Sequence, residues 1–150
     1  MITSTRTLLG TAAAAVLGLG ALATGAGTAT AAPDESGATC RVGTRMFTMA
    51  MQEMTSSTPG QGPDTVVPGQ ARILVNVPEW YGARWSASIS WRDAATGVGG
   101  ALGPQPSDPM APNLTSFARV RTGAGEKVVT ARAVKESGET LTCSGTFTVR

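Results

Sequence analysis

Four methionines between positions 46 and 54 are the residues whose type and spacing most directly suggest chemistry. They are Met46, Met49, Met51 and Met54. Thioether sulfur is a soft ligand that selects Cu(I), and a bound ion needs several sulfurs that converge. In an extended strand, Met49 and Met51 would share one face. One hypothesis is therefore an extracytoplasmic Cu(I)-binding carrier that uses these four residues as metal ligands.

This segment resembles the methionine-rich segments of exported copper carriers. Such carriers usually add histidine to bind Cu(II), and this chain has no histidine. The alternative is structural, because flexible methionines commonly fill irregular gaps in a core. We favour the structural interpretation and expect no cofactor.

Glu79-Trp80-Tyr81 follows Pro78 in a predicted loop and supplies a second candidate site. Exposed aromatic rings could stack on sugar rings, as in carbohydrate-binding modules, with Trp80 and Tyr81 as the ligand-binding residues. The alternative is that both rings cap one end of the fold, each with its apolar body buried and its polar tip in water. The second interpretation is favoured because no flat face with several aromatics is evident.

Catalysis is disfavoured by composition. The absence of histidine excludes Ser-His-Asp and Cys-His nucleophile systems and histidine-ligated zinc. The remaining acid, base and amine groups fall mostly at predicted turns, where carboxylates are usually solvated or bonded to backbone amides. They are Glu79, Asp93, Glu126, Lys127, Lys135, Glu136 and Glu139. No recognisable catalytic constellation emerges, and we expect a protein that is not an enzyme.

Residues 1–31 have the organisation of a cleaved signal peptide. Arg6 precedes an apolar run from Leu8 to Leu22, and Ala29-Thr30-Ala31 matches the small-x-small cleavage pattern. We expect export, followed by a short flexible segment at 32–39 and one domain at 40–150. No membrane span is expected in the mature chain, so the protein is predicted to be secreted or associated with the cell envelope.

Charge is nearly balanced, with a net value of +2 to which Arg6 contributes one unit. A near-neutral surface gives no electrostatic reason for binding nucleic acid or an anionic membrane. Several arginines are expected to decorate the outer faces of strands and keep the sheets soluble. They are Arg41, Arg45, Arg119, Arg121 and Arg132. The expected partner is a protein or a cell-surface component, bound by a monomer.

Cys40 and Cys143 are the only cysteines. In an exported protein such a pair is expected to form a disulfide, which here would join the beginning of the domain to its end.

Alternation of apolar and polar residues with period two predicts β-strands. It is clearest at 140–149, where one face carries Leu141, Cys143, Gly145, Phe147 and Val149. Segment 85–92 places Trp85, Ala87, Ile89 and Trp91 on one face. Strands are also predicted at 72–77, 114–121 and 127–135. In 114–121, Leu114, Ala118 and Val120 are expected opposite Phe117, Arg119 and Arg121.

Turn residues predict the connections. Glu136-Ser137-Gly138-Glu139 should close a hairpin between 127–135 and 140–149, and 122–125 should join 114–121 to 127–135 in the same way. Val67-Pro68-Gly69-Gln70 is expected to be a turn, and 55–65 and 99–113 are expected to be loops. Segment 40–54 fits one strand from Cys40 to about Met49, with a short helix at 46–54 as the alternative.

Six to eight short strands in a single domain predict an all-β, antiparallel sandwich. The chain resembles bacterial secreted immunoglobulin-like domains in Val67-Pro68-Gly69-Gln70 before a strand, in Ile89-Ser90-Trp91-Arg92, and in the closing strand at 145–149. A disulfide between the first and last strands departs from the antibody pattern. The resemblance implies a small, non-enzymatic binding or cell-surface interaction protein that presents its loops, 55–65 and 99–113, to a partner.

Overall fold

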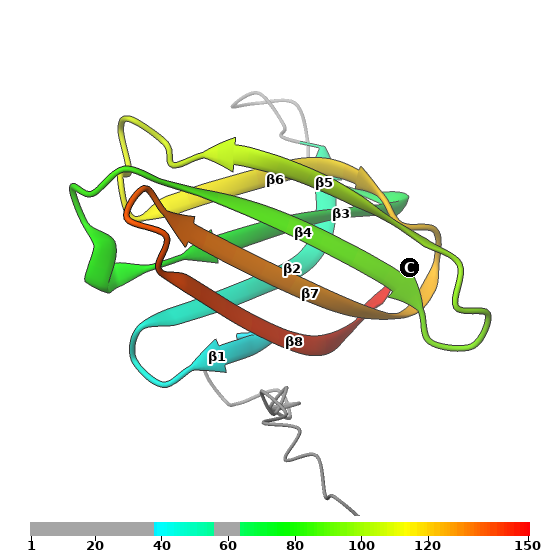
Figure 1. Ribbon diagram of the computed structural model, residues 1–150. Coiled ribbons are helices and arrows are strands. Elements are labelled where there is room, and N and C mark those ends of the chain that lie inside the picture. The colour runs from blue at the N-terminus through cyan, green and yellow to red at the C-terminus, as the bar shows by residue number, and fades with distance from the viewer. Residues whose placement is uncertain (1–37, 56–63) are drawn as a thin grey trace, which may run out of the picture.

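Two antiparallel sheets of four strands form the described part of the chain, residues 38–55 and 64–150 of a computed structural model (Figure 1). In spatial order, the first sheet contains β1 (Cys40–Val42), β2 (Met46–Thr55), β3 (Thr65–Asn76) and β6 (Leu114–Arg121). The second contains β5 (Gly99–Pro106), β4 (Trp85–Asp93), β7 (Gly125–Lys135) and β8 (Thr140–Val149). A single turn of 3-10 helix, η1 (Pro78–Trp80), precedes β4. The predicted signal peptide lies outside the described residues.

The core lies between the inner faces of the two sheets. Ile73 and Val75 of β3 form one apolar cluster with Ile89 of β4 and Ala131 of β7. The expected alternation in 85–92 and 140–149 is confirmed, because the predicted inward residues are buried or pack against this cluster. The arrangement is therefore sandwich-like. Across residues 38–55 and 64–150, no helix has the length and apolarity that a membrane span requires.

The expected disulfide between Cys40 and Cys143 is confirmed. It joins β1 to β8, so it connects the two sheets, with the Cα atoms 5.7 Å apart and 103 positions of sequence between them. Gly145 makes this approach possible, because a Cβ added there would lie 1.9 Å from the carbonyl oxygen of Thr39. Thr39 itself is buried, and its backbone N–H donates to the carbonyl of Thr48 at 2.7 Å.

Both predictions for segment 40–54 are wrong. Instead of one strand or a helix, β1 and β2 form an antiparallel pair, in which Cys40 lies opposite Thr48. The turn between them is closed by a hydrogen bond from the N–H of Arg45 to the carbonyl of Val42 at 3.0 Å. The helix-like spacing of apolar residues fails as a signal because β2 is paired along its length with β3.

The predicted loop 99–113 is also corrected, because its first part is strand β5, paired with β4. The prolines of this segment indicate a loop when the sequence is considered alone. Pro104 and Pro106 are tolerated since β5 lies at the edge of its sheet, where one row of N–H groups has no ladder partner to lose. Residues 107–113 form the connection to β6. Of the other predicted loop, 55–65, positions 56–63 lie outside the described residues.

The predicted hairpin at 136–139 is confirmed, with Val134 opposite Thr140, but the one at 122–125 is wrong. β6 belongs to the first sheet and β7 to the second, so this connection crosses between sheets. The sequence does not distinguish the two arrangements, because a glycine-rich connection suits both a hairpin and a crossing between sheets.

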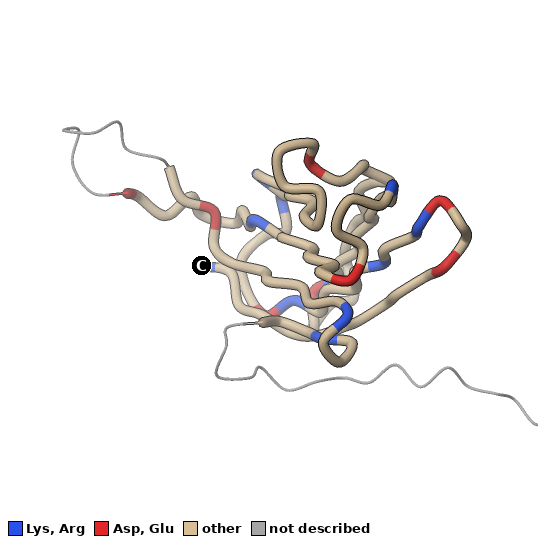
Figure 2. Tube along the Cα trace, turned by 90° about the vertical axis from the view of Figure 1, so that its left-hand side faces the viewer, with Lys and Arg blue, Asp and Glu red and all other residues tan. Residues whose placement is uncertain are grey.

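Charges of both signs are interspersed at the end of the molecule that carries η1, as Figure 2 shows. Arg45, in the turn between β1 and β2, forms ion pairs with Glu79 of η1 and with Glu139 between β7 and β8. These contacts tie three connections together at the surface.

Candidate functional site

The candidate site is built around a break in the register between β2 and β3. Gln52 lies opposite Ala71, but Met54 lies opposite Val66, so Val67–Gln70 face Glu53 alone. The predicted turn at these residues is therefore a bulge within strand β3. The Gln52 side-chain amide fills it by donating to the carbonyls of Val67 at 2.8 Å and Gln70 at 2.9 Å.

The same bulge anchors the last residue of the chain. The N–H of Arg150 donates to Oε1 of Gln52 at 2.7 Å, and the N–H of Gly69 donates to the carbonyl of Arg150 at 2.9 Å. Gly69 has a φ of 67°, a backbone conformation in which glycine avoids the steric cost of a Cβ. The bulge is thus held on both sides by hydrogen bonds.

A second irregularity lies next to the first, between β3 and β6. Ala71 pairs with Val120 and Ile73 with Phe117, so Ala118 and Arg119 face Arg72 alone. This bulge corrects the predicted alternation in 114–121, because Phe117 and Val120 are both buried on the inner face. Arg119 adopts a φ of 54°, the one positive value among non-glycine residues in the described ranges.

Glu53 connects the two irregularities. Its side chain is 4% exposed, with Oε1 accepting from Nη2 of Arg72 at 2.9 Å. Its Oε2 accepts from the backbone N–H of Arg119 at 2.8 Å. Burial raises the pKa of Glu53, but the hydrogen bonds from Arg119 and Arg72 outweigh it and hold the pKa below its ordinary value. A buried, ionised carboxylate therefore fixes the backbone of Arg119.

A groove of about 650 Å³ opens over Glu53. Its lining residues come from β2, β3 and β6 and are Glu53, Met54, Thr55, Val67, Gln70, Arg72, Arg119 and Arg121. A smaller hollow of about 270 Å³ adjoins it and shares Glu53, Met54, Thr55 and Arg72. We call the larger hollow the arginine groove.

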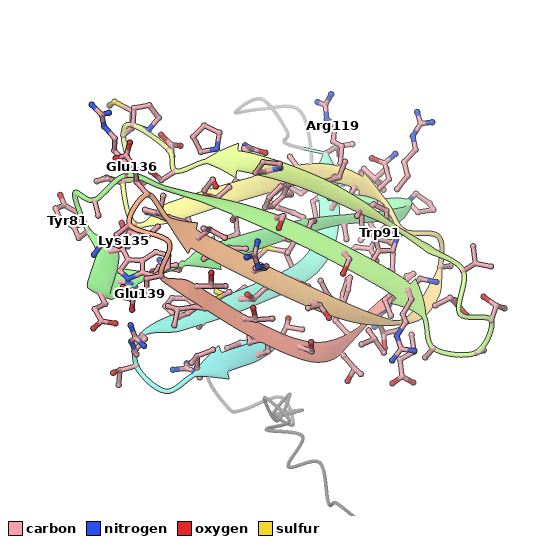
Figure 3. The ribbon with its side chains drawn as sticks, in the orientation of Figure 1. Tyr81, Trp91, Arg119, Lys135, Glu136 and Glu139 are labelled. Carbon is pink, nitrogen blue, oxygen red and sulfur yellow. A yellow bond between two sulfur atoms is a disulfide. The ribbon has the colours of Figure 1, made fainter. Side chains whose placement is uncertain are left out.

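Arg119 and Arg121 are exposed on the arginine groove, and neither forms an ion pair with another described residue. Figure 3 shows the side chain of Arg119 extending away from the sheets. Large apolar side chains that are partly open to water share these hollows: Met54 (45% exposed) lines the arginine groove, and Met51 (38% exposed) lines the adjoining smaller hollow. The site thus combines free guanidinium groups with accessible apolar surface, which suits a ligand that is both anionic and apolar.

The four methionines of the copper hypothesis do not converge. Met46 is fully buried in the core, whereas Met49 and Met51 lie at alternate positions on the other face of β2. Met51 and Met54 line the same small hollow, and Met46 does not. In residues 38–55 and 64–150, no group of three or more cysteine, aspartate or glutamate side chains is placed to hold a metal ion.

The two aromatic residues of the carbohydrate hypothesis, Trp80 and Tyr81, differ in their exposure to solvent. Trp80 is 1% exposed and packs edge-on against Trp85, with ring centroids 6.1 Å apart. Tyr81 is 72% exposed at the end of the molecule (Figure 3). The structure therefore leaves one of the two rings accessible to a ligand.

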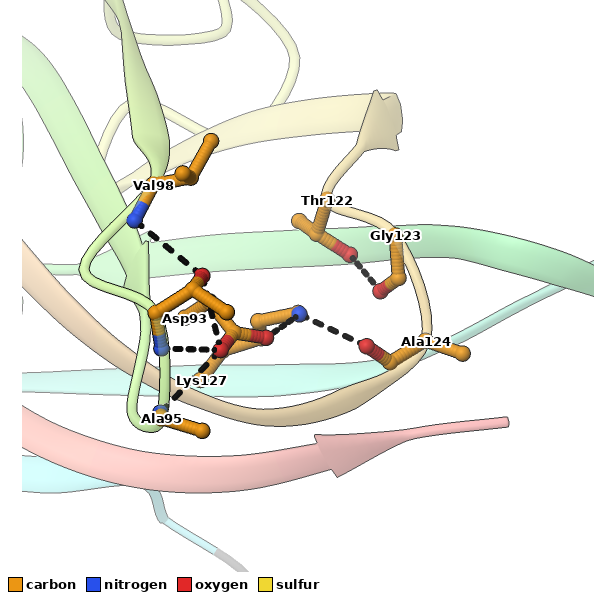
Figure 4. A network of polar contacts seen from close by, with 8 residues as sticks. Asp93, Ala95, Val98, Thr122, Gly123, Ala124 and Lys127 are labelled. Carbon is orange, nitrogen blue, oxygen red and sulfur yellow. Dashed lines mark hydrogen bonds and ion pairs between the residues drawn. The ribbon is translucent and has the colours of Figure 1, made fainter.

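Asp93 and Lys127, considered above as catalytic candidates, form a structural ion pair (Figure 4). The ammonium of the buried Lys127 donates to Oδ2 of Asp93 at 2.5 Å and to the carbonyl of Ala124 at 2.7 Å. Oδ1 of Asp93 accepts from the N–H groups of Ala95 and Thr96. The bond from Lys127, followed by those from Thr96, holds the pKa of Asp93 well below its usual range. The pair connects the β4–β5 turn to the crossing before β7.

The other candidate acid and base groups are divided between separate places on the surface. Glu136 lies 3.9 Å from the guanidinium of Arg84 at an exposed position. Lys135 lies over the ring of Trp80, with Nζ 5.9 Å from its centroid. Glu126 borders a different hollow, beside Thr146 and Phe147. Lys135 and Glu136 thus border one hollow of about 450 Å³ together with Arg84, whereas Glu126 lies at another.

The sequence does not predict the arginine groove, because Arg119 and Arg121 have the pattern of solubilising residues on an outer strand face. The available signal was Val67-Pro68-Gly69-Gln70, which marks an interruption in a strand. Nothing in the local sequence connects that interruption to Glu53, 66 positions before Arg119.

Comparisons with models of protein families, with curated proteins and with solved structures find no match to this chain.

Proposed function

We propose that this protein is an exported, non-enzymatic binding protein of immunoglobulin-like type that binds a protein partner through the arginine groove. The observation that carries the proposal is the pair of exposed guanidinium groups, Arg119 and Arg121, which lack ion-pair partners among the described residues. A buried carboxylate holds the backbone of one of them in a conformation that costs free energy for any residue with a Cβ. Strain of this kind concentrates at binding and catalytic sites.

The immunoglobulin-like assignment is supported by the order of the strands. The chain leaves the first sheet after β3, returns to it for β6, and leaves it again for β7. Crossings of this kind characterise Greek-key sandwiches. β4, which carries Trp91, lies inside its sheet between β5 and β7. The disulfide between β1 and β8 distinguishes this chain from antibody domains, whose bridge joins two inner strands.

Export is supported by two features that are independent of each other. The sequence at 1–31 has the pattern of a signal peptide, and Cys40 and Cys143 are joined in a disulfide. Disulfides persist in oxidising compartments outside the cytosol.

Partner capture with matched variants tests the proposal. The purified protein is immobilised and exposed to culture fluid and cell-envelope extract of the organism that produces it. Retained proteins are then identified by mass spectrometry. Arg119→Gln/Arg121→Gln removes the two guanidinium groups of the groove. Arg92→Gln/Arg132→Gln removes the same charge from exposed positions on the second sheet.

We expect a protein that is retained by the wild type and by the Arg92/Arg132 variant, and lost with the Arg119/Arg121 variant. Retention that is equal for all three proteins, or the absence of any reproducible partner, would contradict the proposal.

A further inference from the structure

The spacing of the two free arginines indicates the shape of what they bind. Arg119, the second residue of the bulge, and Arg121 are two positions apart on β6, and both are exposed while Val120 between them is buried. Alternate residues on a strand are about 6 to 7 Å apart along its axis. An extended peptide has the same repeat, so its side chains at alternate positions can face these two guanidinium groups together.

The charge of the groove indicates an anionic ligand. The lining contains three arginines and one carboxylate, and that carboxylate, Glu53, already accepts hydrogen bonds from Arg72 and from the backbone of Arg119. Guanidinium groups bind carboxylates through two parallel hydrogen bonds, which gives geometric specificity as well as affinity. Arg119 and Arg121 are therefore available to carboxylates of a partner.

The opposite wall of the groove has different chemistry. It is formed by Met54 and Thr55 of β2 and by Val67 in the bulge of β3, and Met54 is 45% exposed. An extended peptide lying in the groove presents successive side chains to opposite walls. One set would meet arginine and the other would meet methionine and valine.

We infer that the arginine groove takes an extended acidic peptide in which carboxylate side chains alternate with apolar ones. The inference rests on the proposed function and specifies the partner segment. Carboxylates at alternate positions pair with Arg119 and Arg121, while the intervening apolar side chains cover Met54 and Val67. The backbone clamp by Glu53 holds Arg119 in place before the peptide arrives, which reduces the conformational entropy lost on binding.

Fluorescence anisotropy with labelled peptides tests the inference on the full protein. The probe is a hexapeptide, Glu-Val-Glu-Val-Glu-Val, and the control is Glu-Glu-Glu-Val-Val-Val, which has the same composition and charge in a different order. We expect the alternating peptide to bind about tenfold more tightly, since one additional charge-assisted hydrogen bond is worth about 1.4 kcal/mol or more.

Variants connect the binding to the groove. Arg119→Gln and Arg121→Gln should each weaken binding of the alternating peptide about tenfold, the equivalent of losing one such bond. Arg92→Gln/Arg132→Gln should leave it unchanged. Arg121→Gln keeps the test informative if replacement of Arg119 disturbs the fold, because Arg121 does not occupy the positive-φ position.

Equal binding of the two peptides, no binding of either, or tighter binding of a sulfated oligosaccharide of equal charge would overturn the inference. Arginine-dependent capture of a partner, combined with failure of the peptide, would refute the peptide class alone. If both the arginine-dependent capture of a partner and the binding of the peptide fail, the proposed function is refuted as well.

Discussion

Oε2 of Glu53 accepts a hydrogen bond from the backbone N–H of Arg119 at 2.8 Å, although 66 positions separate the two residues. The N–H group needs this partner because Ala118 and Arg119 together face Arg72 alone across the bulge in the ladder between β3 and β6. The contact therefore joins β2 to β6 across the intervening strand β3. It couples the register breaks of both ladders and holds the backbone of Arg119, one of the three arginines that line the arginine groove.

Replacing Glu53 should destabilise the fold. Glu53→Ala leaves the partly buried N–H of Arg119 without its acceptor, and an unpaired buried donor costs about 1 to 3 kcal/mol, whereas the half-exposed guanidinium of Arg72 can bind water instead. We expect the free energy of unfolding in urea to fall by about that amount. Glu126→Ala, at an exposed position, is the matched control and should change it little. An unchanged value for Glu53→Ala would contradict the role assigned to the contact.

Glycine should be preferred to alanine at position 119. Because φ there is 54°, a Cβ costs about 1 kcal/mol that glycine does not incur. Arg119→Gly should therefore be more stable to urea than Arg119→Ala. The same pair of substitutions at Arg121 should show the opposite order, as in an ordinary strand, where glycine costs conformational entropy. The same order at both positions would be evidence against a strained backbone at Arg119.

Stability should decline in acid through Glu53 and Asp93. Both have a pKa below the ordinary value, 4.5 for Glu53 and 3.8 for Asp93. Their contributions are complete above those ordinary values and are lost as pH falls through the lower pKa values of the folded state. We expect the free energy of unfolding to fall progressively below about pH 5. Glu53→Gln and Asp93→Asn should each flatten this dependence, as measured by urea titrations from pH 7 to 2.5.

Removal of the disulfide should lower the free energy of unfolding more than removal of any single contact in the arginine groove. The bond closes a separation of 103 residues, for which loop-closure entropy predicts about 4 to 5 kcal/mol of stabilisation. Cys40→Ala/Cys143→Ala should lower the free energy of unfolding by about this amount. Free thiols found by mass spectrometry in the native wild-type protein would show that the bond does not contribute to its stability.

Copper binding by the four methionines is not expected. Because Met46 is in the core while Met49 and Met51 are on the other face of β2, the sulfurs cannot all reach one ion in this fold. Anaerobic titration with Cu(I) should give the same affinity for the wild type and for Met49→Leu/Met51→Leu/Met54→Leu. A large loss of affinity in the variant would restore the carrier hypothesis.

Local pattern was sufficient to predict most of the secondary structure. The alternation of Trp85, Ala87 and Ile89, and of Leu141 and Cys143, follows from a strand with one buried face, and each of these side chains is buried. The disulfide was predictable as well, because the chain contains one pair of cysteines and a signal peptide pattern. The predictions failed where turn chemistry was ambiguous: prolines suit both a loop and an edge strand, which concealed β5.

The sequence by itself determined the all-β class, the inward residues of the regular strands and the cysteine pair, since each depends on neighbours in the chain or on residue type. Only the tertiary structure decided that the segment at 122–125 crosses between sheets and that Glu53 reaches Arg119. The reason is physical. Pairing across a sheet is set by register, and a bulge shifts register by opposing two or more residues to one, so residues distant in sequence become hydrogen-bond partners that no local pattern can identify.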